Sequence, residues 1–246
     1  MSKKVALVTG GAGGLGTAIS RRLSSDYQVV VSYFKNGQHD LAREWQASQK
    51  EQGYLLDIFY ADVTKYDDCV ALVEFVNQSY GRIDVLVNNA GVTSDHVLKK
   101  MTPEQWQYVL DSNLTSVFNV TRNVLALMLE QHYGRIISIS SINGRKGQFG
   151  QCNYAASKAA LFGFSKSLAL EVAKSGITVN TIAPGYMHTH LLDNIPENVM
   201  DQIIANIPVG RLGLPDEVAA AVAFLAGSEA AFITGANLDI NGGQYM

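Results

Sequence analysis

The fold is decided by the stretch Val5-Ala6-Leu7-Val8-Thr9-Gly10-Gly11-Ala12-Gly13-Gly14-Leu15-Gly16. Its apolar beginning is typical of a buried strand, and a helical pattern over residues 15–24 follows the glycines at once. Glycines let a backbone turn sharply and approach a phosphate, while a helix N-terminus offers free N–H groups and the positive end of its dipole. The stretch therefore predicts a strand, a turn and a helix that bind the pyrophosphate of a dinucleotide. A turn with a purely structural role is the alternative interpretation.

Two glycine spacings are met in this turn. The common dinucleotide fingerprint is matched by Gly11, Gly13 and Gly16, and a wider G-x-x-x-G-x-G pattern is matched by Gly10, Gly14 and Gly16. The residues expected to contact the cofactor in this turn are Gly10, Gly11, Gly13, Gly14, Leu15 and Gly16.

Outward from this turn, short apolar runs alternate with helical patterns along the chain. The expected strands are residues 5–8, 28–33, 54–60, 83–87, 135–140, 178–182 and 237–240. The expected helices include residues 15–24, 67–80, 105–131, 152–175 and 215–225. Repeated strand–helix–strand order predicts an α/β fold, with a doubly wound (Rossmann) parallel seven-stranded sheet and helices on both faces. We expect residues 1–246 to form one domain, with residues 185–213 as a substrate lid.

The composition excludes several classes of protein. The net charge is −3 and the pI is near 5.9, so the chain has no general attraction to nucleic acid. No apolar run reaches the roughly 20 residues of a membrane helix, and we expect no membrane association. The cysteines, Cys69 and Cys152, indicate no disulfide framework and a reducing cytoplasm. We interpret Cys152 as a small buried residue.

The end of the second expected strand bears on the choice between NADPH and NADH. An acidic residue roughly 20 positions after the glycine turn would bind the ribose 2′-hydroxyl of NADH and would repel a 2′-phosphate. The strand ends here in Val31-Ser32-Tyr33-Phe34-Lys35-Asn36, which contains no acid. This absence, together with the nearby Lys35, favours NADPH. An ordinary solvated lysine is the alternative interpretation of Lys35.

A second motif, between residues 140 and 158, carries acid–base chemistry. Tyr154 and Lys158 are four residues apart at the start of an expected helix, so their side chains share one face. A tyrosine hydroxyl ionises near a pH of about 10, and a neighbouring ammonium lowers this pKa, so that Tyr154 could donate a proton to an alkoxide. Ser141 ends the preceding strand, where its hydroxyl could hydrogen-bond a substrate carbonyl. The alternative is an ordinary pair on a helix surface, because Tyr-x-x-x-Lys often occurs by chance.

The chain resembles the short-chain dehydrogenase/reductase family from end to end. The matching motifs are residues 9–16, Asp62-Val63, Asn88-Asn89-Ala90-Gly91, Asn113, Ser141, Tyr154 with Lys158, and Pro184-Gly185 with Thr189. The resemblance implies that Tyr154 is the acid, that Lys158 holds the nicotinamide ribose and lowers the tyrosine pKa, and that Ser141 orients the carbonyl. It also implies that Asn113 holds a water linking Lys158 to solvent, whereas an asparagine at a helix kink is the alternative.

Other contacts and the assembly also follow from the resemblance. The implied further cofactor contacts are Asp62, Val63, Asn89, Ala90, Gly91, Pro184, Gly185 and Thr189, together with Tyr154 and Lys158. No metal site is expected. The family usually assembles as tetramers, which implies a homotetramer built through residues 111–131, 152–175 and 237–246.

Closer matching points to one carbonyl substrate. Residues 144–154, 113–121 and 207–215 resemble bacterial acetoacetyl-CoA reductases, which implies reduction of acetoacetyl-CoA to (R)-3-hydroxybutyryl-CoA for polyhydroxybutyrate synthesis. The resemblance departs at Cys152 and at the end of the second strand. Gln148, Phe149, Gln151 and Tyr186 would line the acyl pocket. Alternatively, Phe149 packs in the core and the glutamines are solvated.

The main alternative function is a 3-oxoacyl-acyl-carrier-protein reductase, which performs the same chemistry on another carrier. Acyl carrier protein is strongly acidic, so a reductase for it presents basic residues near the mouth of the site. The stretch Leu127-Met128-Leu129-Glu130-Gln131-His132-Tyr133-Gly134 has an acid and no lysine or arginine, which favours coenzyme A, although Arg122 or Lys174 could contribute. A reductase of another small ketone or sugar and a non-enzymatic regulator on the same fold are further alternatives.

Overall fold

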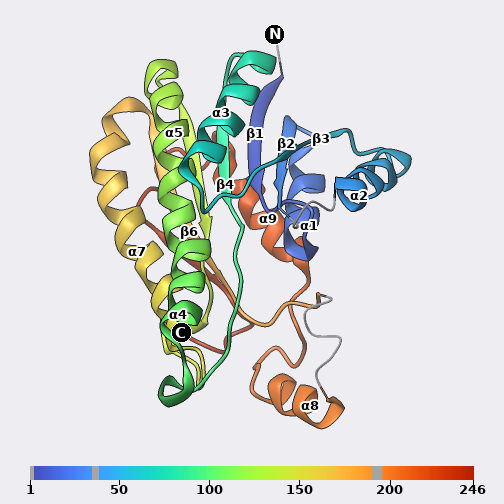
Figure 1. Ribbon diagram of the computed structural model, residues 1–246, viewed down its shortest axis with the longest axis vertical. Coiled ribbons are helices and arrows are strands. Elements are labelled where there is room, and N and C mark those ends of the chain that lie inside the picture. Colours follow the sequence, from blue (N-terminus) through green and yellow to red (C-terminus); the bar gives the residue numbers. More distant parts are fainter. Residues whose placement is uncertain (1–2, 35–38, 190–195) are drawn as a thin grey trace.

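A parallel sheet forms the centre of the computed structural model, which describes residues 3–34, 39–189 and 196–246 (Figure 1). Its seven strands lie in the order β3-β2-β1-β4-β5-β6-β7, and every neighbouring pair is parallel within these residues. The strands are β1 (Lys4–Thr9), β2 (Tyr27–Tyr33), β3 (Leu56–Tyr60), β4 (Val85–Asn88), β5 (Gly134–Ile139), β6 (Ile177–Pro184) and β7 (Asn237–Ile240). The predicted doubly wound parallel sheet is confirmed, and its strand order reverses direction at β1 and β4.

Helices cover both faces of the sheet. They are α1 (Gly14–Leu23), α2 (His39–Glu51), α3 (Tyr66–Tyr80), α4 (Pro103–Leu110), α5 (Ser116–Gln131), α6 (Asn143–Lys146), α7 (Cys152–Val172), α8 (Glu197–Ala205) and α9 (Pro215–Ala226). Short 3-10 turns are η1 (Leu98–Lys100) and η3 (Ala173–Ser175). Helices α3, α5 and α7 lie on one side of the strands, and α1 and α9 lie on the other (Figure 1). In the described parts of the chain, no helix has the length and apolar content to cross a bilayer.

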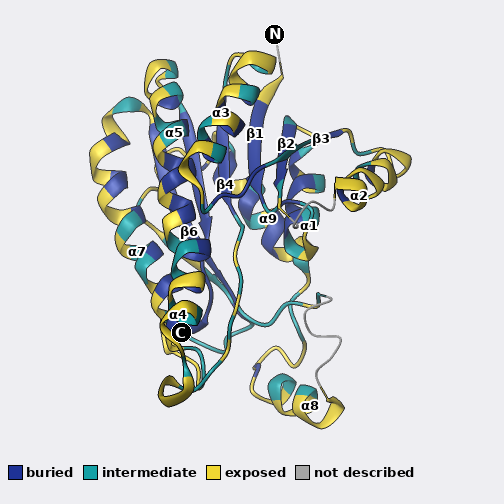
Figure 2. Cartoon of the chain, in the orientation of Figure 1, coloured by how far each residue is buried: buried dark blue, intermediate teal, exposed yellow. Residues whose placement is uncertain are grey.

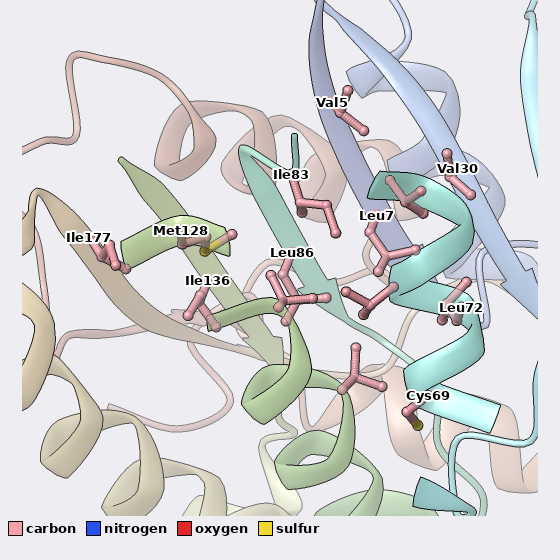
Figure 3. Close-up of a cluster of buried hydrophobic side chains, with 14 of the residues drawn as sticks. Val5, Leu7, Val30, Cys69, Leu72, Ile83, Leu86, Met128, Ile136 and Ile177 are labelled. Atoms are coloured by element: carbon pink, nitrogen blue, oxygen red, sulfur yellow. The ribbon is translucent and has the colours of Figure 1, made fainter. Parts of the chain in front are cut away.

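The alternation of side chains along β1 shows how one strand serves two cores. Val5 and Leu7 pack in the cluster under α3, α5 and α7, which Figure 3 shows in close-up. Ala6 and Val8 pack in the opposite cluster with α1 and α9. Burying a large aliphatic side chain stabilises the fold by about 1.5–3 kcal/mol. In a strand covered on both faces every side chain is buried, so its sequence is a continuous apolar run. This requirement is why the apolar runs of the sequence marked the strands well.

The helix predicted over residues 105–131 has a different form. It begins earlier, at Pro103, where Thr102 Oγ1 accepts the Gln105 N–H at 3.3 Å in a capping box. It is then interrupted by a π-helical turn, η2 (Asp111–Thr115), before α5 continues. A π turn inserts one extra residue into a helix and often marks a functional position. Here it contains the candidate residue Asn113.

Three helices were not predicted, namely α2, α8 and the four-residue α6. Helix α2 buries only Ala42 and Gln49, so it lacks the apolar stripe by which a surface helix is recognised. Helix α8 lies inside the segment 185–213, which was expected to be a substrate lid and for which no helix was predicted, and none of its described residues is buried. Residues 190–195 of that expected lid lie outside the described residues.

Candidate active site

The candidate site lies at the carboxyl ends of β1, β4, β5 and β6. Loops that leave this edge of a doubly wound sheet commonly bind ligands where the strand order reverses. The glycine turn follows β1, Asn89 follows β4, Ser141 comes shortly after β5, and Gly185 follows β6. The fold therefore brings together motifs that are as much as 175 positions apart in the chain, from Gly10 to Gly185.

The conformation of the glycine turn is fixed by close packing of its own backbone and by hydrogen bonds to the loop after β4. Gly10 has a φ of +61°, and a Cβ at Gly16 would lie 2.7 Å from Gly11 Cα, so the turn requires glycine at both positions. Thr9 Oγ1 accepts the Asn89 N–H at 3.0 Å and the Ala90 N–H at 3.1 Å. Asn89 Nδ2 in turn donates to Thr9 O at 3.0 Å. These bonds join the loops after β1 and β4.

The start of α1 fits the pyrophosphate of a dinucleotide. The helix begins at Gly14, and its cap residue Gly13 offers no side chain to the first-turn N–H groups. Those groups and the positive helix end can therefore face an anion that approaches the glycines. Thr189 lies beside the same turn, because a Cβ at Gly14 would meet Thr189 Cγ2 at 3.3 Å. The residues present thus fit the cofactor that the sequence indicated.

The other predicted cofactor residues lie at neighbouring strand ends. Asp62, two residues after β3, accepts the Thr64 N–H at 3.1 Å through Oδ1 and is largely buried. The Val63 carbonyl accepts from Asn119 Nδ2 at 3.1 Å, which holds this loop against α5. Gly185 packs closely on Asn241, where a Cβ would meet Asn241 Cα at 2.9 Å. Lys35, the residue expected near a 2′-phosphate, lies outside the described residues.

Lys158 is anchored at both of its ends, to the last residue of β5 and to the residue that follows it. Its side chain is 4% exposed, and Nζ donates to the Ile139 carbonyl at 2.8 Å. Its own carbonyl accepts from Ser140 Oγ at 2.8 Å. The ammonium lies 5.8 Å from the centroid of the Tyr154 ring, so the predicted pair does share one helix face.

The pKa of Tyr154 corrects one expectation. Lys158 was expected to lower this pKa, but burial raises it, and Asp95 adds to the rise while the Ser141 side chain opposes it. Burial also lowers the pKa of Lys158 to about 8. The reason is that burial removes hydration from both groups, which disfavours the charged form of each. Tyr154 consequently keeps its proton at neutral pH, as a general acid must.

Asn113 is a buried connector at the π turn. Its Nδ2 donates to Val92 O at 3.0 Å and to Ser157 Oγ at 3.1 Å, and its Oδ1 accepts the Val92 N–H at 2.8 Å. A Cβ at Gly91 would lie 3.1 Å from Asn113 Oδ1 and 3.3 Å from Lys158 Nζ, so the asparagine and the lysine are close neighbours. Asn113 therefore does more than occupy a kink. The water expected between these two residues stays a prediction.

The four predicted substrate residues have different surroundings. Phe149 is 87% exposed, so the alternative that it packs in the core is wrong. Gln148 and Tyr186 line a groove of about 480 Å³ together with Val199 and Ile203 of α8. Gln151, by contrast, is bonded to protein groups, as it accepts from Asn143 Nδ2 at 2.9 Å and donates to Asp95 at 2.7 Å. Cys152 is exposed and not buried as expected, because in the first turn of α7 it is Asn153 that is buried.

Asn153 and Gly144 shape the site and were not predicted from the sequence. Asn153 is fully buried, accepts the Tyr154 N–H at 2.8 Å, and donates to the Ser94 carbonyl at 3.0 Å. Gly144 touches α7, because a Cβ there would lie 2.9 Å from the carbonyl carbon of Lys158. Their partners are distant in the chain or depend on helix contact, so no local pattern could have identified them.

Comparison with known proteins agrees with this geometry. A family model described as short chain dehydrogenase matches residues 4–199. The chain is 50% identical to an acetoacetyl-CoA reductase of Shinella zoogloeoides and 48% identical to one of Allochromatium vinosum, with 99% of each chain covered. It is also 43% identical to the 3-oxoacyl-[acyl-carrier-protein] reductase of Escherichia coli, over 99% of this chain and 98% of that protein. The chain therefore belongs to the short chain dehydrogenase family.

Proposed function

We propose that the protein reduces acetoacetyl-CoA to (R)-3-hydroxybutyryl-CoA, with NADPH as the cofactor. The observation that carries the proposal is the pairing of the half-buried Tyr154 with the buried Lys158 beside Ser141. The two acetoacetyl-CoA reductases that match the whole chain at 48% and 50% identity support this choice of substrate.

The proposed roles follow from the chemistry of each side chain. The Ser141 hydroxyl donates a hydrogen bond to the 3-keto oxygen and stabilises negative charge there. The bound nicotinamide supplies a hydride to the carbonyl carbon. The Tyr154 hydroxyl gives its proton to the resulting alkoxide oxygen, and its raised pKa keeps that proton available. The Lys158 ammonium is placed to hold the hydroxyls of the nicotinamide ribose.

The choice of NADPH rests on the end of β2. The described residues there, Ser32, Tyr33 and Phe34, carry no carboxylate that would repel a 2′-phosphate. We expect kcat/KM for NADPH to exceed that for NADH by about tenfold or more, as a single charge contact can provide. Steady-state rates with each cofactor at saturating acetoacetyl-CoA measure this ratio. An NADH preference of about tenfold would contradict the assignment.

The carrier of the acyl group is the second choice to test. The end of α5 has Glu130 and no lysine or arginine between residues 127 and 134, which supports coenzyme A over an acidic carrier protein. The carrier-protein reductase at 43% identity supports the second candidate function. NADPH oxidation with acetoacetyl-CoA and with acetoacetyl carrier protein separates them. A higher kcat/KM for the carrier protein would overturn the choice of coenzyme A.

We further propose one catalytic domain over residues 1–246 and a cytoplasmic homotetramer whose product feeds polyhydroxybutyrate synthesis. The exposed apolar side chains of Phe118, Leu170, Leu238 and Met246 support burial of residues 111–131, 152–175 and 237–246 between subunits. Light scattering on the purified protein should give four times the chain mass of 26.7 kDa. A monomer mass would overturn the tetramer.

A further inference from the structure

The Ser141 hydroxyl is held by a chain of hydrogen bonds that begins at the protein surface. The Asn143 N–H donates to Ser141 Oγ at 3.1 Å. Asn143 Nδ2 donates to Gln151 Oε1 at 2.9 Å, and Gln151 Nε2 donates to Asp95 Oδ2 at 2.7 Å. The chain thus links the candidate catalytic serine to an exposed carboxylate on the loop after β4.

The first bond of this chain decides what the serine can do. A hydroxyl has one proton and two lone pairs, so a hydroxyl that accepts from a backbone N–H keeps its proton free to donate. A carbonyl oxygen that gains negative charge requires a donated hydrogen bond. The Asn143 N–H therefore restricts Ser141 to orientations in which its proton can point toward the substrate.

The side chain of Asn143 adds an anchor for this N–H to the backbone bonds of the turn. Asn143 begins α6, a helix of only four residues, and the preceding Ile142 provides no side-chain cap. The Asn143 side chain is buried, and its amide donor is used on Gln151. Gln151 in turn precedes α7 and pairs with the His96 backbone in an isolated bridge.

The hydrogen bond between Gln151 and Asp95 differs from the other two because its acceptor is charged. A carboxylate acceptor makes a bond roughly twice as strong as a neutral one. Asp95 therefore holds the Gln151 amide with its oxygen directed at Asn143. Linked hydrogen bonds that run from a charged, exposed end to a buried bond on Ser141 fix orientation better than three independent contacts would.

We propose that Asn143 is a positioning residue for Ser141, anchored through Gln151 to Asp95. The inference rests on the proposed function, since it assumes that Ser141 touches the substrate carbonyl. In this proposal Gln151 supports Ser141, whereas the sequence predicted that Gln151 contacts the acyl group.

A double-mutant cycle tests the proposal. Asn143→Ala and Gln151→Ala are each made with Ser141 present and in the Ser141→Ala background, and kcat is measured by NADPH oxidation. We expect each to lower kcat about tenfold when Ser141 is present, because small displacements of an aligned group are costly, and less than about twofold in its absence. Two variants keep the test decisive if one of them folds poorly.

The control is Asn123→Ala, which removes an amide whose Nδ2 donates to the Asn119 carbonyl on α5 at 2.8 Å, and it should leave kcat unchanged. Equal losses in both Ser141 backgrounds, or a wild-type kcat in both single variants, would overturn the proposal. Every rate is also measured with ethyl acetoacetate. Activity on this keto ester but not on acetoacetyl-CoA would contradict the proposed substrate while still deciding the role of Asn143, and activity on neither would overturn both.

Discussion

The first turns of α7 and the whole of α8 face the same substrate region and are built in opposite ways. In α7, Asn153, Ser157 and Lys158 are buried and bonded to other elements. In α8, none of the nine described residues is buried, and Figure 2 shows the helix almost entirely in the colours of exposed and intermediate residues. The atoms that perform the proposed chemistry are therefore held rigidly, while one wall of the groove is held by few contacts.

This difference separates catalysis from substrate choice. Elements with few buried contacts open at low cost in free energy, and lids and binding segments are drawn from them. Changes around α7 should therefore reduce turnover, and changes in α8 should act on substrate affinity. Three substitutions test this separation, and a fourth tests the cost of burying Lys158 in α7.

Replacing Tyr154 by Phe should have the largest effect. It removes the proton donor and keeps the ring, so kcat should fall about 10²- to 10⁴-fold, the usual contribution of a positioned acid, with NADPH affinity nearly unchanged. Steady-state turnover and fluorescence titration of NADPH measure the two quantities. Tyr66→Phe, at an exposed tyrosine on α3, is the control. Retained turnover would show that another group donates the proton.

Gly144→Ala should have the next largest effect. Its Cβ would lie 2.9 Å from backbone atoms of Lys158 and Ala159, so α6 must move away from α7. We expect kcat to fall about 10- to 100-fold, because the Ser141 turn moves relative to Tyr154, and stability to fall by about 1–3 kcal/mol.

The matched control for Gly144→Ala is Gly163→Ala within α7. A Cβ at Gly163 meets nothing within 4 Å, so the change should stabilise the helix by about 0.5–1 kcal/mol. Urea unfolding and kcat are measured for both variants. Equal behaviour of the two alanines would contradict the close packing of α6 on α7.

Lys158→Met should stabilise the cofactor-free protein. Burial lowers the pKa of Lys158 from 10.5 to about 8, so the folded protein binds this proton less tightly than the unfolded chain does. The resulting penalty is complete below about pH 8 and fades as the pH rises toward 10.5. The variant should therefore gain about 1–3 kcal/mol at a pH of about 7 and less at about 9.5, as measured by urea unfolding. A less stable variant at neutral pH would contradict the cost of burying this ammonium.

Ile203→Ala, on the groove side of α8, should have the smallest effect. It removes apolar area from the wall of the groove, so KM for acetoacetyl-CoA should rise about three- to tenfold while kcat stays the same. Asn198→Ala, at an exposed position of the same helix, is the control. A fall in kcat without a change in KM would contradict the expectation that α8 affects substrate affinity and α7 affects turnover.

Most of the sheet and the catalytic pair could be predicted from local patterns. Buried parallel strands need continuous apolar runs, and the spacing of Tyr154 and Lys158 places both on one face of α7. Helix α2 escaped prediction because it buries so little. The upward shift of the Tyr154 pKa could not be predicted, because the burial that causes it depends on segments distant in the sequence. The bond from Gln151 to Asp95 joins residues 56 positions apart, which no local spacing encodes.

The stereochemistry of the wild-type product tests the proposed reduction of acetoacetyl-CoA. The protein is incubated with acetoacetyl-CoA and NADPH, and the 3-hydroxybutyryl group is analysed by chiral chromatography while NADPH oxidation is followed. We predict the (R) enantiomer, with one NADPH consumed for each product molecule. The (S) enantiomer, or no reduced product in the presence of bound NADPH, would contradict the account.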